Sequence, residues 1–388
     1  MKKIVLLIIS ILSVTIQSFA WEYESPDFEV DGFYYLINNK NSNEVWLMCG
    51  KGNGDPRNPI VPSIVNYDGK SYTVTAVYGN PYFSYDHNDT LETITLPNTI
   101  KSIVSGAFQG CRNLREFKIP PLVTIIGNST FYGCTSLESV ELSPNLQDIG
   151  SYAFHGCSAL KSISFPSSLT SLGSNAFEGC TSLKFPEDML ENISVIEDGT
   201  FKDCSSLKSV NLSPTITTIG SSAFSGCTSL LSIKIPENAI LKSINERAFY
   251  GCSSLTEITI PEKVSIVGNE AFINCTSLER IFCYPVEPPS PGFHGANVFD
   301  LGTYQNAILY VPNSSLSLYK RSEPWIWFVG NIKPLEESGV ESVVYANEGY
   351  FRVFDLKGAN ILNTSNKSEI DNLSPGIYII NGKKTVVK

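Results

Sequence analysis

Several features that catalytic and nucleic-acid-binding proteins depend on are scarce or missing in this chain. It has three histidines, none in an H-E-x-x-H pattern, and it lacks G-x-S-x-G and phosphate-loop patterns. Lysine and arginine number 28 against 38 acidic residues, and the formal charge of −10 argues against the basic face that nucleic acids need. The sequence therefore predicts a protein that is not an enzyme, holds no cofactor and binds no nucleic acid.

Long apolar runs are also missing, except at the N-terminus. A basic start, MKK, precedes the apolar run Ile4–Ile16, and the small residues Ser18 and Ala20 follow. This run is too short and wrongly flanked for a membrane span, whereas the order is typical of an export signal. We expect residues 1–20 to be a signal peptide cleaved after Ala20, and the mature chain to have no transmembrane segment.

What the chain has instead is a regular row of cysteines. Successive members are 23, 23, 23, 24, 23, 25 and 23 residues apart, and each ends a similar phrase, such as SALKSISFPSSLTSLGSNAFEGC. A period in the low twenties is typical of a solenoid built from stacked copies of one unit. No C-x-x-C pair or histidine companion points to a metal site. The eight cysteines are Cys111, Cys134, Cys157, Cys180, Cys204, Cys227, Cys252 and Cys275.

Each repeat predicts a short strand, a stop and a return. In TSLESVELSPNLQDIGSYAFHGC the residues Leu137, Val140 and Leu142 form an inward-facing strand pattern, and a proline ends it. Leu146 and Ile149 form a second apolar pair on the return side, and the AF-x-G-C phrase predicts a helical or 3₁₀ turn. The other predicted strands are Leu91–Leu96, Leu114–Ile119, Leu160–Phe165, Leu207–Leu212, Leu230–Ile235 and Leu255–Ile260.

The fold class expected from these repeats is α/β leaning to mainly β. We predict a solenoid of about 8–10 turns of roughly 23 residues with a parallel β-sheet, because one unit cannot bury its own apolar face. The phenylalanine of every AF phrase should then stack in an internal ladder beside the cysteines. The repeat at 181–204 meets Pro186 early, so we expect a disturbed strand there.

The cysteines are expected to be buried free thiols that act as small apolar side chains. Neighbouring rungs lie within Cα range of a disulfide, but their side chains should point the same way. Cys49 and Cys283 are out of register, so any disulfide would most readily involve one of them. The residue before each ladder cysteine is glycine, with Asp203 and Asn274 as the only substitutes, which indicates a left-handed backbone conformation.

These phrases resemble the BspA-type leucine-rich repeat, L-x-x-I-x-I-P-x-x-L-x-x-I-G-x-x-A-F-x-x-C. The resemblance covers residues 72–283, and Tyr72–Phe83 is similar to a degenerate first copy. By the same resemblance, residues 21–71 are expected to form a β-rich N-terminal cap and residues 284–335 a C-terminal cap. We expect Trp325 and Trp327 to cover the last rung, because a solenoid end must not leave a bare edge.

A separate tail follows the solenoid at residues 336–388. Its stretches YFRVFDLKGANIL and LSPGIYIINGKKTVVK predict strands around turns, and a small C-terminal β-sandwich domain is expected. The tail resembles the C-terminal sorting domain of the type IX (Por) secretion system, which implies passage across the outer membrane and surface attachment or release. A purely structural β domain is the alternative.

The candidate binding site is the row of outward positions between the two aliphatic residues of each strand. Solenoids commonly use such a row as an extended binding face, although each residue alone could simply be a solvated surface position. Charged neighbours of the row include Arg115, Glu116, Glu138, Lys161, Lys208 and Glu257. The row itself is Thr95, Lys118, Glu141, Ser164, Asn211, Lys234 and Thr259.

The resemblance implies a secreted or cell-surface binding protein, associated with the outer membrane or extracellular. Proteins of this type are similar to adhesins that engage host extracellular-matrix proteins or other bacteria. A glycan-capturing component is the second hypothesis, for which Tyr132, Tyr152 and Tyr250 on the turn side are the candidates. The third is a structural surface protein without a specific ligand. His155 holds the variable place of AF-x-G-C and is expected to be a surface residue.

Overall fold

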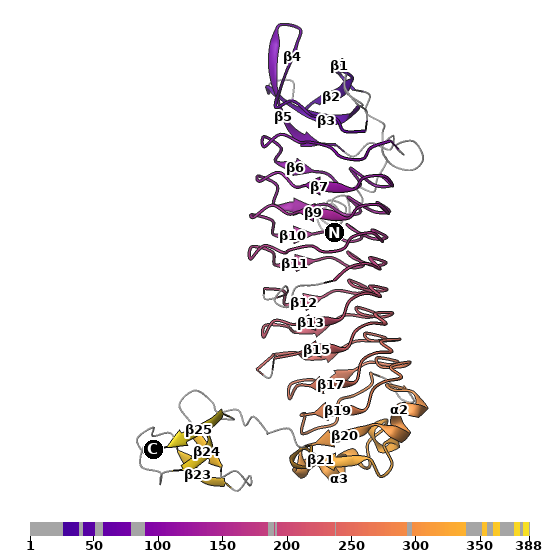
Figure 1. The fold of residues 1–388 in the computed structure, drawn as a ribbon, viewed down its shortest axis with the longest axis vertical. Helices are drawn as coiled ribbons and strands as arrows, with labels where there is room; N and C mark the ends of the chain where they lie inside the picture. Colours follow the sequence, from indigo (N-terminus) through magenta and orange to yellow (C-terminus); the bar gives the residue numbers. More distant parts are fainter. Residues whose placement is uncertain are drawn as a thin grey trace, which may run out of the picture.

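The structure is a computed structural model in which the chain winds into a solenoid of about ten turns (Figure 1). This confirms the predicted fold class. The signal-peptide prediction falls outside the described residues. Side chains are not described for 49–50 or beyond 350. The described residues are 26–38, 42–50, 57–78, 90–184, 190, 192–236, 238–292, 297–338, 351–354, 360–364, 376–380 and 383–387.

Five strands precede the regular turns and join them through β5. Strands β1–β3 pair antiparallel, β5 lies parallel to β3, and the β4–β5 hairpin projects at the N-terminal end (Figure 1). Asp-Gly pairs with positive φ form the tight turns at Asp31 and Asp68. The second half of β5 pairs with the first solenoid strand, so this sheet is continuous with the solenoid. The strands are β1 (Phe28–Val30), β2 (Phe33–Ile37), β3 (Glu44–Gly50), β4 (Ile64–Tyr67) and β5 (Lys70–Val77).

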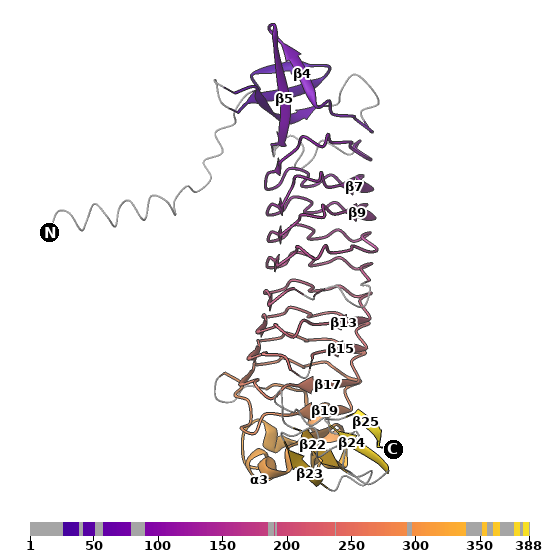
Figure 2. The same cartoon turned by 90° about the vertical axis from the view of Figure 1, so that its left-hand side faces the viewer.

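The predicted strands form one row along the solenoid, whose outward side we call the strand face. Figure 2 shows members of this row aligned along one edge. Two predicted strands, Leu91–Leu96 and Leu160–Phe165, are reduced to single bridged residues, Thr95 and Ser162. The row contains β7 (Glu116–Lys118), β9 (Ser139–Glu141), β13 (Ser209–Asn211), β15 (Ser232–Lys234) and β17 (Glu257–Ile260).

A second row of parallel strands runs along the return side, and its outward side is the return face. The sequence indicated only an apolar pair there, because two-residue strands leave no alternation to detect. Each strand points one side chain inward, as Ile149 does in β10. The row contains β6 (Ser102–Ile103), β8 (Ile125–Ile126), β10 (Asp148–Ile149), β11 (Ser171–Leu172), β12 (Val195–Ile196), β14 (Thr218–Ile219), β16 (Ser243–Ile244) and β18 (Ile266–Val267).

Both rows are interrupted at the 24-residue repeat. On the return side β11 ends one sheet and β12 begins another. On the strand face, one paired segment ends with β9 and Ser162 before this repeat, and the next begins with β13 and β15 after it. The described residues on both sides of this repeat thus show an interruption where a disturbed strand was predicted. Residues 185–189 lie outside the described residues. At the 25-residue repeat only the strand face is interrupted, between β15 and β17, while the return strands β14, β16 and β18 stay paired.

The AF-x-G-C phrases form successive hydrogen-bonded turns, not helical or 3₁₀ turns as predicted. The residue before each ladder cysteine has positive φ, including Asp203 and Asn274, which confirms the predicted left-handed backbone. A second positive-φ residue precedes each AF pair, and left-handed residues at both ends of the turn prevent a helix from extending. Glycine is found at only two of these second positions, so the sequence pattern did not mark them; they hold Gly106, Ser129, Tyr152, Asn175, Gly199, Ser222, Arg247 and Glu270.

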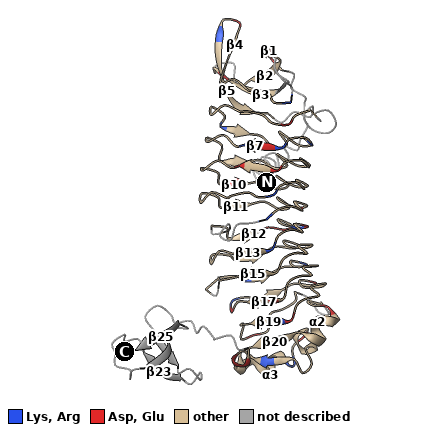
Figure 3. Cartoon of the chain, viewed as in Figure 1, with Lys and Arg blue, Asp and Glu red and all other residues tan. Residues whose placement is uncertain are grey.

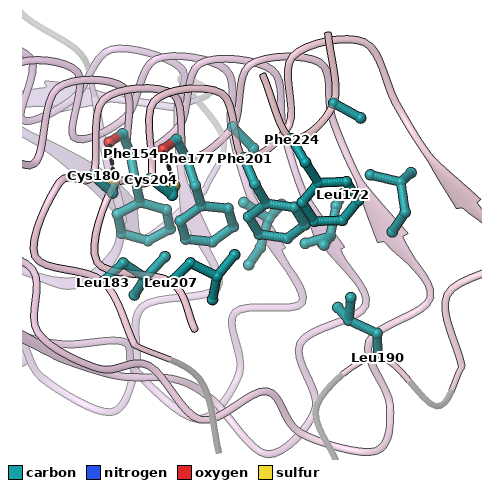
Figure 4. Packing of buried hydrophobic residues seen from close by; sticks show 14 of the residues in the cluster. Phe154, Leu172, Phe177, Cys180, Leu183, Leu190, Phe201, Cys204, Leu207 and Phe224 are labelled. Carbon is teal, nitrogen blue, oxygen red and sulfur yellow. Dashed lines mark hydrogen bonds between the residues drawn. The ribbon is translucent and has the colours of Figure 1, made fainter. Parts of the chain in front are cut away.

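The core is a pair of ladders, one of phenylalanine rings and one of thiols (Figure 4). Phe154 and Phe177 stack with ring centroids 5.2 Å apart, and the ring of Phe201 lies 5.6 Å further on. The Cys180 Sγ donates to the carbonyl of Phe154 over 3.1 Å, and this contact recurs along the ladder. The ladder cysteines are buried and free, as predicted, and so is Cys283.

Burial also determines the chemistry of these thiols. It raises the pKa of Cys111, Cys275 and Cys283 to about 12, because a thiolate is poorly solvated in an apolar core. Nucleophilic attack and oxidation need the thiolate, so these groups are inert at neutral pH while the chain is folded. Cys283 lies 3.3 Å from the Tyr319 hydroxyl, which itself donates to the Pro285 carbonyl.

The C-terminal end adds further rungs rather than only a lid. Phe299 extends the phenylalanine ladder beyond Phe272 at 5.2 Å, a rung that the sequence phrase does not mark. Trp325 is fully buried against Phe299, as expected, whereas Trp327 is 37% exposed. The elements are β19 (Arg280–Cys283), α2 (Leu301–Asn306), β20 (Ile308–Val311), η1 (Asn313–Ser315), α3 (Leu316–Tyr319), η2 (Trp325–Trp327), β21 (Ile332–Pro334) and η3 (Leu335–Glu337).

The tail contains one four-stranded antiparallel sheet in the order β23-β22-β24-β25. The predicted strands are thus present, and the described tail residues form a single sheet where a sandwich was expected. Over the described residues, no helix is both long and apolar enough to cross a membrane. The strands are β22 (Phe351–Phe354), β23 (Asn360–Thr364), β24 (Gly376–Ile380) and β25 (Lys383–Val387).

Candidate functional site

The seven predicted site residues lie on the strand face in two groups. Thr95, Lys118, Glu141 and Ser164 belong to consecutive turns before the 24-residue repeat, and the other three follow it. Five of the seven are exposed, whereas Asn211 and Thr259 are half-buried. The row is therefore divided, and we call its two parts the upper and lower strand face.

A hollow of about 620 Å³ occupies the upper strand face. Its floor consists of the strand backbone and the edges of buried side chains such as Phe117, Val140 and Ile163. The predicted residues that line it are Thr95, Lys118, Glu141 and Ser164. The structure brings these four side chains together in one concavity, which a linear pattern could not reveal.

Ion pairs link neighbouring turns across this upper face. Lys118 and Glu141 are in register on β7 and β9, and their Nζ and Oε1 atoms are 2.7 Å apart. Glu138 contacts Lys161 one turn further on, and the hydrogen bond and charge of Lys161 lower the pKa of the Glu138 carboxyl. Both pairs are exposed, so each contributes little to stability and can rearrange around a ligand.

The lower strand face differs in charge and in shape. Asn211 pairs in register with Lys234, and no described residue forms an ion pair with that lysine. Thr259 is in register with Phe282, which stacks on Tyr310 with ring centroids 5.3 Å apart. Both rings hold outward positions of the sheet yet are at most 6% exposed. They were missed by the sequence analysis and offer no open aromatic platform.

Two of the three tyrosines that would favour glycan binding lie around one histidine on the turn side, and the third lies apart. Tyr132 is stacked on His155 at 4.5 Å, which covers one face of its ring, and Tyr152 lies 5.9 Å from the same histidine. Arg247 lies over Tyr250, several turns away. His155 is half-buried and 3.3 Å from Glu178, so it is less open than the surface position expected.

Side chains suited to catalysis or metal binding are not grouped in the described part of the chain. No cluster of three or more histidine, cysteine or acidic side chains could hold a metal ion there. The hydroxyls that follow the ladder cysteines serve the backbone, as when Ser158 Oγ donates to the Thr135 carbonyl and Thr181 Oγ1 to the Ser158 carbonyl. Figure 3 shows acidic and basic residues interspersed along the solenoid.

Several solved structures are similar to this chain, and three of them illustrate the range. A leucine-rich repeat protein from Bacteroides ovatus shares 24% identity over 76% of this chain and 96% of its own, with a TM-score of 0.45. The pneumococcal vaccine antigen PcpA shares 20% identity over 79% and 96%, with a TM-score of 0.41. A leucine rich cell surface protein from Faecalibacterium prausnitzii shares 21% over 67% and 95%, with a TM-score of 0.30.

A search of curated proteins found no match. The family comparison is more specific, since the BspA type leucine rich repeat region matches residues 80–192 and 187–285. Together these segments cover 206 of the 388 residues, and they contain the cysteine ladder, the phenylalanine rungs from Phe108 to Phe272 and both strand rows from β6 to β18. The chain therefore belongs to the BspA type leucine-rich repeat family.

Proposed function

We propose that this chain is a surface adhesin that engages a protein partner through the upper strand face. The observation that carries the proposal is the hollow of about 620 Å³, which is lined by four predicted site residues on successive turns. Proteins of this repeat family are bacterial surface proteins, and their solenoids are typically binding scaffolds rather than enzymes. Host extracellular-matrix proteins and the surfaces of other bacteria are the partners we propose.

The physical properties of this surface suit protein recognition. Its backbone is held by inter-turn hydrogen bonds and by a buried core, so little ordering entropy is lost when a partner docks. Its mixed charges are exposed, so they favour recognition by electrostatic complementarity over nonspecific hydrophobic association. Glycan binding has less support, because the aromatic ring in the hollow, Phe117, is 4% exposed and cannot stack on a sugar.

Filling the hollow tests this proposal. The variant Ser164→Trp places a bulky ring in the hollow, and Ser171→Trp places the same ring on the return face at another exposed serine. Both full-length variants would be titrated against immobilised extracellular-matrix proteins and a glycan array. We expect Ser164→Trp to weaken protein binding about tenfold, equivalent to roughly 1.4 kcal/mol, and Ser171→Trp to leave it unchanged.

Other outcomes would count against the upper strand face. Equal binding by both variants would exclude the hollow as the contact surface. Binding to glycans alone would assign the chain to carbohydrate capture, and binding to neither array, with intact folding, would favour a structural surface role.

We further propose that export uses residues 1–20 and that residues 336–388 act as a type IX sorting tail. The basis is the sequence pattern of both segments, together with the family's surface location. Removing residues 336–388 should leave the solenoid in the periplasm, as measured by cell fractionation and surface labelling. Unchanged surface labelling of the truncated chain would indicate a purely structural tail.

A further inference from the structure

The two parts of the strand face differ in how their lysines are neutralised. Before the 24-residue repeat, the lysines on and beside the upper face are paired: Lys118 with Glu141, and Lys161 with Glu138. After Lys161, the same lengthwise row continues through Lys184, Lys208 and Leu231. Backbone bonds link Lys184 N to the Lys161 carbonyl and Leu231 N to the Lys208 carbonyl, so these side chains belong to stacked turns.

Lys184, Lys208 and Lys234 are exposed, and none forms an ion pair with any described residue. The outward residues around Lys208 and Lys234 are Ser209, Asn211, Leu231 and Ser232, of which none is acidic. In the next turn of the described strand face, the carboxylate of Glu257 is already held by Arg280 at 2.6 Å. In a chain with a formal charge of −10, these three lysines form a local group of cations that has no ion-pair partner among the described residues.

The spacing of this group fits an extended anionic chain. The turns of Lys208 and Lys234 are paired through β13 and β15, and successive rungs of a parallel sheet are about 4.8 Å apart. The hydrogen bond from Ser206 N to the Thr181 carbonyl joins the turn of Lys184 to that of Lys208. The ammonium groups can therefore reach carboxylates on one segment that runs along the solenoid. Flexible lysine stems act as mobile point charges, which suits several separate carboxylates better than one planar group. Neutralising three mutually repelling cations makes association with an acidic segment favourable, and the effect weakens as salt rises.

One neighbouring side chain distinguishes between two kinds of polyanion. Leu231 is 52% exposed in the row of Lys184 and Lys208, and it lies in the same turn as Lys234. A polypeptide can offer an apolar side chain to Leu231 beside its carboxylates, whereas a sulfated glycan has no comparable group. The combination of three free cations with one apolar contact therefore favours protein.

We propose that Lys184, Lys208, Lys234 and Leu231 form a docking surface for an acidic, partly apolar segment of a protein partner. This inference rests on the proposed function, because it identifies the kind of protein that the strand face takes. In this proposal the lysines recognise the charge of the partner, and the hollow of the upper strand face recognises its shape.

The test uses the full chain and a labelled synthetic peptide of glutamate, leucine and serine, followed by fluorescence anisotropy at low and high salt. The variant Lys184→Gln/Lys208→Gln/Lys234→Gln removes the unpaired charges. The matched control, Lys101→Gln/Lys202→Gln/Arg247→Gln, removes the same charge from three cations that are ion-paired in the structure and lie outside the strand face. We expect the first to weaken binding about tenfold at low salt and the control to change it less than about twofold.

Two further measurements make the result decisive. Leu231→Ser should weaken binding of this peptide but not of one in which serine replaces every leucine. Heparin serves as the competing sulfated glycan. Equal losses in the two triple variants, no saturable peptide binding, or tighter heparin binding that ignores Leu231→Ser would each overturn the proposal.

The outcome is separable from that of the proposed function. The peptide is too short to need the hollow, so Ser164→Trp should bind it normally. Peptide binding that depends on the three lysines, together with normal binding of protein partners by Ser164→Trp, would reject the hollow as a binding site and support the lysine surface. The reverse pattern would retain the hollow and reject the lysine surface.

Discussion

Phe177→Ala is expected to destabilise the solenoid by about 3–5 kcal/mol, the range for truncating a buried aromatic side chain. The Phe177 ring is fully buried and lies between Phe154 and Phe201, so its removal opens a void that both neighbours border (Figure 4). Because each turn contacts only its neighbours, the loss should be concentrated near this rung. Urea denaturation would measure the total, and hydrogen exchange would locate it in the turns of Phe154, Phe177 and Phe201.

Two variants calibrate this result. Phe177→Leu retains much of the volume and should cost clearly less than alanine. Leu122→Ala removes an apolar side chain that is 51% exposed on the return side, and its effect should stay within about 0.5 kcal/mol. Wild-type denaturation of Phe177→Ala would show that the phenylalanine ladder does not stabilise the fold.

Gly173→Ala is expected to cost about 3 kcal/mol, for a reason unrelated to backbone flexibility. Gly173 is not among the glycines with positive φ. A Cβ atom there would lie 2.6 Å from the carbonyl carbon of Gly150 and 2.8 Å from Ser151 Cα, both in the backbone of the preceding turn. Moving the turns apart would break the 2.7 Å hydrogen bond from Gly173 N to the Ile149 carbonyl.

Gly179→Asn is the matched control. Gly179 has φ of +75°, but a Cβ atom there meets nothing closer than 3.6 Å, and Asn274 adopts the same conformation at the equivalent position. Its cost should be below about 1 kcal/mol. Thermal melts of the two variants would show which substitution lowers stability more. A smaller loss of stability for Gly173→Ala than for Gly179→Asn would contradict the close-approach explanation.

Three other residues hold the position equivalent to Gly173. They are Val104, in the first copy, and Glu197 and Asn245, in the repeats of 24 and 25 residues. The sequence shows where glycine is replaced, whereas the close approach at Gly173 is a contact between turns and is visible only once the turns are stacked.

The binding surface was less predictable than the core. The outward row could be read from strand alternation, and four of its members do line one hollow. Which lysines are neutralised depends on side chains about 23 residues apart, such as Lys118 and Glu141, that meet only when the register is fixed. The row of Lys184 and Lys208 therefore became meaningful only after the ion pairs of the upper face were known.

The sequence alone determined the solenoid, its period, the phenylalanine and cysteine ladders and the left-handed residue before each cysteine. These features repeat in every unit and depend on local conformation and on burial of one apolar face, so a single repeat contains their cause. The tertiary structure decided the second strand row, the Phe299 rung, the division of the strand face and the hollow. Each of these depends on how one turn rests on the next, which no single repeat encodes.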